Sequence, residues 1–137
     1  MRRTTTLLLT GLLLSGAAVG CSKSYAENAK DCATALTERT GGDSADTPTV
    51  EEAEERTDAF DKTLADMVRS GYEDLAKKAF DKAEEKTEES WKDRPEACEP
   101  LSEDDYTTLL TAKAIDGLGW TDNGRFDKLK MVEGLGD

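Results

Sequence analysis

Thiols and carboxylates are the groups in this sequence that could do chemistry. Three cysteines stand at positions 21, 32 and 98, and 30 of the 137 residues are acidic. A thiol can be alkylated, oxidised to a disulfide or deprotonated to bind a metal. Histidine, the commonest general base and metal ligand, is absent. Without histidine, sulfur and carboxylate oxygen are the leading candidates for reactive groups.

The first cysteine ends a segment with the features of a secretion signal. Arg2 and Arg3 give a short cationic start, and residues 7–19 form an apolar run. As a helix this run would be about 20 Å long, too short for a hydrocarbon core of about 30 Å. We therefore expect residues 1–20 to be a signal peptide and no part of the folded domain.

The end of this segment, Ala18-Val19-Gly20-Cys21, resembles the lipobox of bacterial lipoprotein signal peptides. The family prefers leucine where Ala18 stands, whereas Gly20 and Cys21 match it well. The resemblance implies that a diacylglyceryl group is attached to the Cys21 sulfur and that the chain is cleaved before this residue. Residues 21–23 would then be a lipidated cysteine and a short tether. The alternative is an ordinary secretory signal with a chance cysteine.

Charge indicates how such a chain would meet its surroundings. The net charge is −12, and it becomes −14 once the two arginines of residues 1–20 are removed. Such an acidic body excludes nucleic acid as a partner and is repelled by anionic lipid headgroups. Two acyl chains give a stable hold on a bilayer. The expected location is the extracytoplasmic face of the cell membrane, with the lipid on Cys21 as the membrane contact.

The other two cysteines are expected to form a disulfide. Exported chains enter an oxidising compartment, where an isolated pair such as Cys32 and Cys98 usually bridges. Closing this loop would stabilise the fold by about 4 kcal/mol. Two buried free thiols are the alternative. A zinc site is not expected, because two thiols without histidine do not supply four ligands.

Helical periodicity predicts an all-α fold: a small bundle of four or five helices in a single acidic domain, residues 24–137. Helices are expected at 25–38, across 50–92, from Ser102 to Gly117, and in a short segment ending at Gly134. A flexible loop is expected near 40–49. Ser70-Gly71 predicts a break within 50–92, although one long helix with a drifting apolar stripe is the alternative.

The apolar content is low for a folded domain. From residue 21 onward, Leu, Ile, Val and Phe make up about 14% of the chain, less than the roughly 20% below which highly charged chains are often disordered. A largely disordered acidic spacer is therefore an alternative to the helical bundle. Helix caps and clear periodicity favour the bundle, with the disulfide compensating for a thin core.

Two tryptophans are the candidate binding residues. Trp120 follows Gly117-Leu118-Gly119, so its indole could be presented at the rim of a groove, or it could fill the core between the last two helices. Trp91, beside Arg94-Pro95, has the same two interpretations. We expect no catalytic residue, metal or cofactor, since no nucleophile elbow, phosphate loop or histidine partner is present.

As a whole, residues 21–137 resemble the small, acidic, helical lipoproteins of high-GC Gram-positive bacteria. The resemblance rests on composition, on the lipobox and on the cysteine pair, and it transfers no active-site residue. The expected function is that of a non-catalytic envelope lipoprotein that contacts a protein or cell-wall partner. The alternatives are a carboxylate-based hydrolase of envelope polymer and the disordered spacer.

Overall fold

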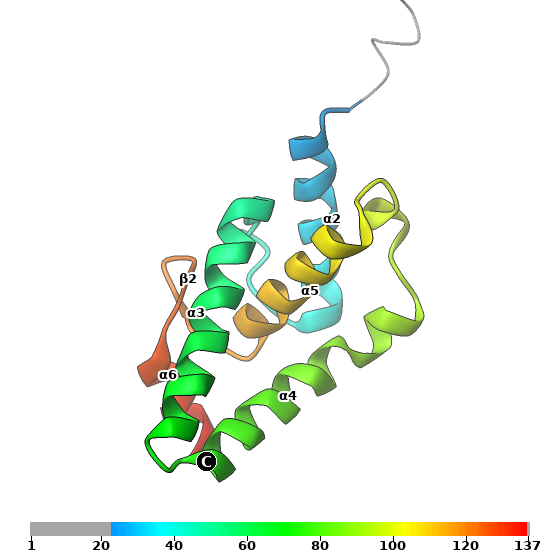
Figure 1. Ribbon diagram of the computed structural model, residues 1–137. Coiled ribbons are helices and arrows are strands. Elements are labelled where there is room, and N and C mark those ends of the chain that lie inside the picture. The colour runs from blue at the N-terminus through cyan, green and yellow to red at the C-terminus, as the bar shows by residue number, and fades with distance from the viewer. Residues whose placement is uncertain (1–22, 137) are drawn as a thin grey trace, which may run out of the picture.

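The computed structural model describes residues 23–136, which form a bundle of five α-helices with one short hairpin (Figure 1). The expected all-α bundle is therefore confirmed. Residues 1–22, on which the expected signal peptide and lipidated Cys21 fall, lie outside the described residues. The elements in chain order are α2 (Tyr25–Thr40), α3 (Val50–Arg69), α4 (Glu73–Lys92), the 3-10 helix η1 (Glu96–Cys98), α5 (Glu103–Gly117), β1 (Thr121–Asp122), β2 (Arg125–Phe126) and α6 (Lys128–Leu135).

Three of the helices begin at the hydroxyl caps that the sequence indicates. Ser24, Thr49 and Ser102 each accept a hydrogen bond from the amide three residues later, at 3.1–3.2 Å. Such a bond satisfies a backbone donor that has no partner within the helix. Local sequence therefore fixes where α2, α3 and α5 start.

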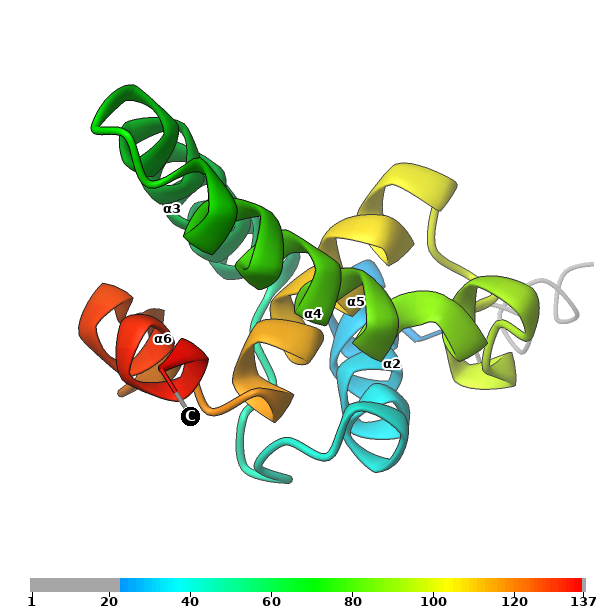
Figure 2. The same ribbon diagram turned by 90° about the horizontal axis from the view of Figure 1, so that it is seen from below.

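The predicted break at Ser70-Gly71 is confirmed. α3 ends at Arg69, and Gly71 has a φ of +91°, which a glycine adopts without strain. The residue that caps α4 is Tyr72, which makes no side-chain cap bond. α3 and α4 diverge from this turn, and α5 crosses behind the gap between them (Figures 1 and 2).

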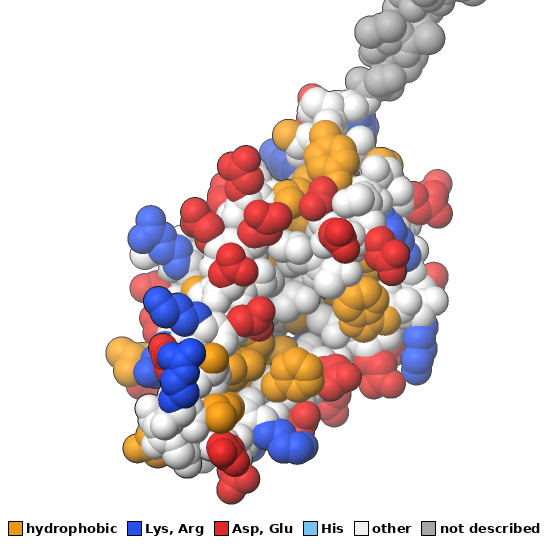
Figure 3. All heavy atoms as spheres, viewed as in Figure 1, with side chains coloured by type: hydrophobic (Ala, Val, Ile, Leu, Met, Phe, Trp, Pro, Cys, Tyr) orange, Lys and Arg blue, Asp and Glu red, His pale blue; other side chains and the backbone are white. Residues whose placement is uncertain are grey.

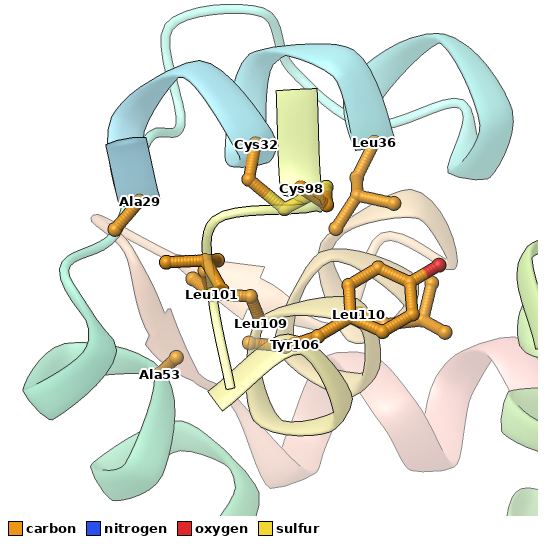
Figure 4. Close-up of a cluster of buried hydrophobic side chains, with 10 residues drawn as sticks. Ala29, Cys32, Leu36, Ala53, Cys98, Leu101, Tyr106, Leu109 and Leu110 are labelled. Carbon is orange, nitrogen blue, oxygen red and sulfur yellow. A yellow bond between two sulfur atoms is a disulfide. The ribbon is translucent and has the colours of Figure 1, made fainter. Parts of the chain in front are cut away.

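The expected disulfide joins Cys32 of α2 to Cys98 of η1, and both residues are fully buried. In Figure 4 Leu36, Leu109 and Tyr106 lie on the side of the disulfide where α5 runs. This is the first of two core clusters, and α5 supplies much of it. The covalent link thus closes the part of the core that α2, η1 and α5 build together.

The second core cluster lies where α3, α4 and α6 meet the end of α5. Phe60, Ile115, Trp120 and Met131 are among its members. The exposure of the side chains of α6 differs from one apolar residue to the next. Leu129 of α6 is 73% exposed, whereas Met131 is buried. Two clusters and a buried disulfide contradict the alternative of a largely disordered spacer.

Gly117 has a structural role other than the one expected of a helix terminator. It is the last residue of α5, and the positive φ of +80° belongs to Gly119. A Cβ on Gly117 would come within 2.0 Å of the carbonyl oxygen of Thr40. The glycine is therefore required because α2 ends directly against α5.

Within residues 23–136, none of the helices combines the length and the apolarity needed to cross a bilayer.

Candidate binding surface

Two aromatic side chains of α4 are uncovered on the same side of the helix. Phe80 is 53% exposed and Trp91 is 47% exposed. They are eleven residues apart, which is close to three full turns, so both project from one face. This face borders a groove of about 450 Å³ between α3, α4 and α5. On the face shown in Figure 3, hydrophobic side chains gather in the hollow between α3 and α4, with mostly acidic side chains around it.

Trp91 is held in place by its neighbours. Its indole Nε1 donates to the hydroxyl of Thr87 at 3.1 Å, and its ring meets the Tyr106 ring edge to face at 6.3 Å. The Tyr106 hydroxyl donates to the carbonyl of Ser90, and the Arg94 guanidinium lies 4.5 Å from the Tyr106 ring centre. The exposed indole is thus oriented before any partner arrives, which lowers the entropy lost on binding.

Threonines form much of the groove wall: Thr57, Thr87, Thr107, Thr108 and Thr111. Four of their hydroxyls donate to backbone carbonyls of their own helices, at 2.8–3.0 Å. The Trp91 donor is also used within α4. Most of the wall donors therefore already have acceptors inside the protein.

Two carboxylates line the groove from opposite walls, Asp61 on α3 and Glu84 on α4. Among residues 23–136, the ion pairs involve other acids and leave these two without a cation. Burial raises the pKa of Asp61 above its ordinary value, and the nearby Asp58 carboxylate raises it further. The groove therefore combines aromatic surface with two carboxylates that form no ion pair among residues 23–136.

Trp120 is a core residue, so the interpretation that places its indole at a groove rim is wrong. The side chain is 2% exposed, and its ring stacks on that of Phe60 with the centres 5.9 Å apart. Glycine at position 134 lets α6 approach closely, because a Cβ there would lie 3.2 Å from the indole nitrogen. The structure thus separates the two tryptophans, with Trp91 at the groove and Trp120 in the second core cluster.

A buried ionic network is the polar feature that the sequence pattern did not indicate. The Arg56 guanidinium donates to both carboxylate oxygens of Asp46 at 2.9 Å. Its remaining N–H groups bond to the carbonyl oxygens of Ala112 and Gly124. A paired, fully hydrogen-bonded guanidinium is the arrangement in which burial of this charge is tolerated.

Lys113 completes this network from α5. Its ammonium group bonds to the carbonyls of Asp43 and Asp46 and lies 3.6 Å from the carboxylate of Asp116. The same carboxylate accepts from the Asp43 amide and from the Thr121 hydroxyl, both at 2.8 Å. The loop expected near 40–49 is present, but these bonds anchor it to α5. Lys113, a lysine inside the mostly apolar run of residues 109–115, is the sequence feature that could have indicated this site.

A second and more polar hollow, of about 780 Å³, lies beside this network between the 41–49 loop and the hairpin. Among the charged residues that line it, Asp46 and Asp116 pair with the buried cations, and Lys130 pairs with Asp122 at 3.6 Å. Asp43 and Glu52 also line it and form no ion pair among residues 23–136. Among residues 23–136, no group of three or more acidic or cysteine side chains is placed to hold a metal ion. No aromatic residue lines this hollow, whereas Phe80 and Trp91 line the groove along α4, so the groove is the better candidate for contact with a partner.

Comparisons with protein-family models, with curated proteins and with solved structures found no match for this chain.

Proposed function

We propose that this protein is a lipoprotein held at the extracytoplasmic face of the cell membrane by a diacylglyceryl group on Cys21. There it would act without catalysis, by contacting another component of the envelope. The observation that carries the proposal is the lipobox-like sequence ending in Gly20-Cys21, four residues before the start of α2 at Tyr25. A signal peptide of this type and a folded domain directly after it suit a tethered protein.

The disulfide supports an extracytoplasmic location. Cys32 and Cys98 are bonded and buried in the first core cluster. Disulfides form and persist in oxidising compartments and are rare in the cytosol. A domain whose core includes such a bond is suited to folding after export.

The charge distribution is compatible with a domain that stands next to lipid without binding to it. In Figure 1, α2, α3 and α5 begin in the upper part of the view, where the described chain starts. Their first turns carry six acids: Glu27, Glu51, Glu52, Glu103, Asp104 and Asp105. These acids stabilise the helix N-termini and would also repel anionic headgroups. The segment from Cys21 to Ser24 spans at most about 10 Å, so the repulsion would act at short range.

The groove supports an interaction role. Exposed aromatic side chains in a preformed concavity are typical of binding sites, and Trp91 is oriented by its contacts with Thr87 and Tyr106. We assign the contact with the envelope partner to this surface.

The test is a Cys21→Ser substitution in the full chain, with Ser22→Ala as the neighbouring control. We expect the control to be found with membranes and to carry a diacylglyceryl mass at its N-terminus. The Cys21→Ser protein should lack this mass and leave the membrane fraction once unprocessed precursor is excluded. A bare Cys21 thiol in the mature wild-type protein would refute the proposal.

One observation favours a second candidate, a carboxylate-based hydrolase of envelope polymer. Asp61 and Glu84 line one groove, and burial raises the pKa of Asp61, as a general acid requires. Release of soluble fragments from purified wall polymer, lost in both Asp61→Asn and Glu84→Gln, would support this candidate. Equal release by both variants and wild type, or no release, would remove it.

A further inference from the structure

Phe80 and Trp91 lie at the edge of the hydrophobic core, where Trp91 meets the ring of Tyr106. Neither ring belongs to the two core clusters, yet each is about half exposed beside the buried ring of Phe60, which forms part of the groove. Along α4 the two residues are separated by about 16 Å, the rise of eleven residues. A partner helix of about three turns would span this distance, with its apolar residues spaced for one face.

Hydrogen bonding in the groove indicates which chemistry could occupy it. The donors of Thr57, Thr87, Thr107 and Thr108 are already used within their helices, as is the indole donor of Trp91. A carbohydrate needs both donors and acceptors from its site, so this wall is poorly suited to one. The strong acceptors that remain are carboxylates, and these favour a ligand that carries positively charged donors.

Charge also argues against a second copy of this chain. The part of the chain after residue 20 has a net charge of −14, and the groove itself holds Asp61 and Glu84 without a cation among residues 23–136. Two such surfaces would repel each other when brought together. A basic partner would instead gain from these two carboxylates.

We propose that the groove binds an amphipathic helical segment of a basic partner protein. Its apolar face would cover Phe80 and Trp91, and its lysine or arginine side chains would reach Asp61 and Glu84. The inference rests on the proposed function, since it names the surface and the partner chemistry of the same envelope contact. Burial of two half-exposed aromatic rings would supply favourable binding free energy, and the carboxylates would select for a cationic partner.

The test uses the full lipidated protein in phosphatidylcholine nanodiscs, with empty nanodiscs as the blank. The probe is a synthetic amphipathic helix of leucine and lysine at helical spacing, and its counterpart carries glutamate in place of lysine. Binding is followed by calorimetry and by the emission of tryptophan. We expect the lysine peptide to bind and to shift the emission to shorter wavelength. The shift should be absent in Trp91→Phe, which retains only the buried Trp120.

Matched variants locate the binding site. Phe80→Ala should weaken binding about tenfold, whereas Leu129→Ala, which removes an exposed side chain from α6, should change it less than about twofold. Asp61→Asn should weaken binding about threefold and reduce its salt dependence, whereas Asp104→Asn on the first turn of α5 should not. Circular dichroism of each variant confirms that the fold is retained.

Each of four results would overturn the inference. These are equal losses in the groove variants and in their controls, binding of the glutamate peptide, no binding of either peptide, and displacement of the lysine peptide by wall glycan fragments. Concentration-dependent dimerisation lost in Phe80→Ala would assign the groove to a second copy instead. None of these outcomes alters the Cys21→Ser result. Conversely, a bare Cys21 thiol would refute the lipid anchor while leaving the measured groove affinity unchanged.

Discussion

The ammonium group of Lys113 lies 2.6 Å from the carbonyl oxygen of Asp46 and 3.3 Å from its carboxylate, with no side-chain surface exposed to solvent. Arg56 approaches the same carboxylate from α3. One acid in the loop thus pairs with two buried cations on two helices, and Asp116 of α5 is a second carboxylate beside Lys113. Through Asp46, the 41–49 loop therefore links α3 to α5.

Replacing Asp46 by asparagine should destabilise the fold by about 3 kcal/mol, because Arg56 would remain buried without a compensating charge and Lys113 would keep only Asp116. Urea unfolding followed by circular dichroism measures the change. The matched control is Asp66→Asn, which removes an exposed ion pair with Arg69 and should cost less than about 0.5 kcal/mol. Similar losses in both variants would show that the network contributes no more than a surface pair.

The same carboxyl should make stability depend on pH in the acid range. Burial by itself raises the pKa of Asp46, but the hydrogen bonds and charge of Arg56, together with Lys113, outweigh it and hold the pKa below 3.8. A pKa that is lower in the folded state stabilises the fold above the unfolded value, and this stabilisation is lost as the pH falls through the folded value. We expect the difference between wild type and Asp46→Asn to be largest above about pH 5 and to shrink below about pH 4. Urea midpoints measured across this range would contradict the assignment if the difference stayed constant.

Removal of the disulfide by Cys32→Ala with Cys98→Ala should lower the free energy of unfolding by about 4 kcal/mol, since the bond closes a loop between residues 66 apart. Urea titration and the thermal midpoint both report the loss. Wild type unfolded and refolded under reducing conditions should match the double variant. A variant as stable as the oxidised protein would mean that the two core clusters suffice without the covalent link.

Substitutions of the two tryptophans should differ in how much they lower the free energy of unfolding. Trp120→Ala should cost about 3–5 kcal/mol, because the ring fills the second core cluster against Phe60. Trp91→Phe should change stability by less than about 1.5 kcal/mol, since a half-exposed aromatic ring is replaced by another. Differential scanning calorimetry gives both values. Comparable losses would place Trp91 in the core and remove it from the groove.

The features that could be predicted from the sequence are those set by nearby residues. The caps at Ser24, Thr49 and Ser102 act over three residues, so they locate helix starts directly. The turn at Gly71 likewise depends on the conformation of a single residue. The pairing of Cys32 with Cys98 is long-range, but it was the one choice left once Cys21 was assigned to lipid.

The features that could not be predicted depend on contacts between distant segments. α4 buries the small residues Ala76, Ala79 and Ala83, which leaves Phe80 outside, and periodicity alone did not distinguish the two faces. The pairing of Asp46 with Lys113 crosses 67 residues in a chain with 30 acids. The candidate groove could not be predicted for the same reason, because its walls come from three separate helices.

α5 supplies Leu109 and Leu110 to one core cluster and Ile115 to the other. The two core clusters therefore share one helix, so that separation of α5 would open both of them. Unfolding should proceed as a single event, and the amide hydrogens of α5 should be the last to exchange with heavy water.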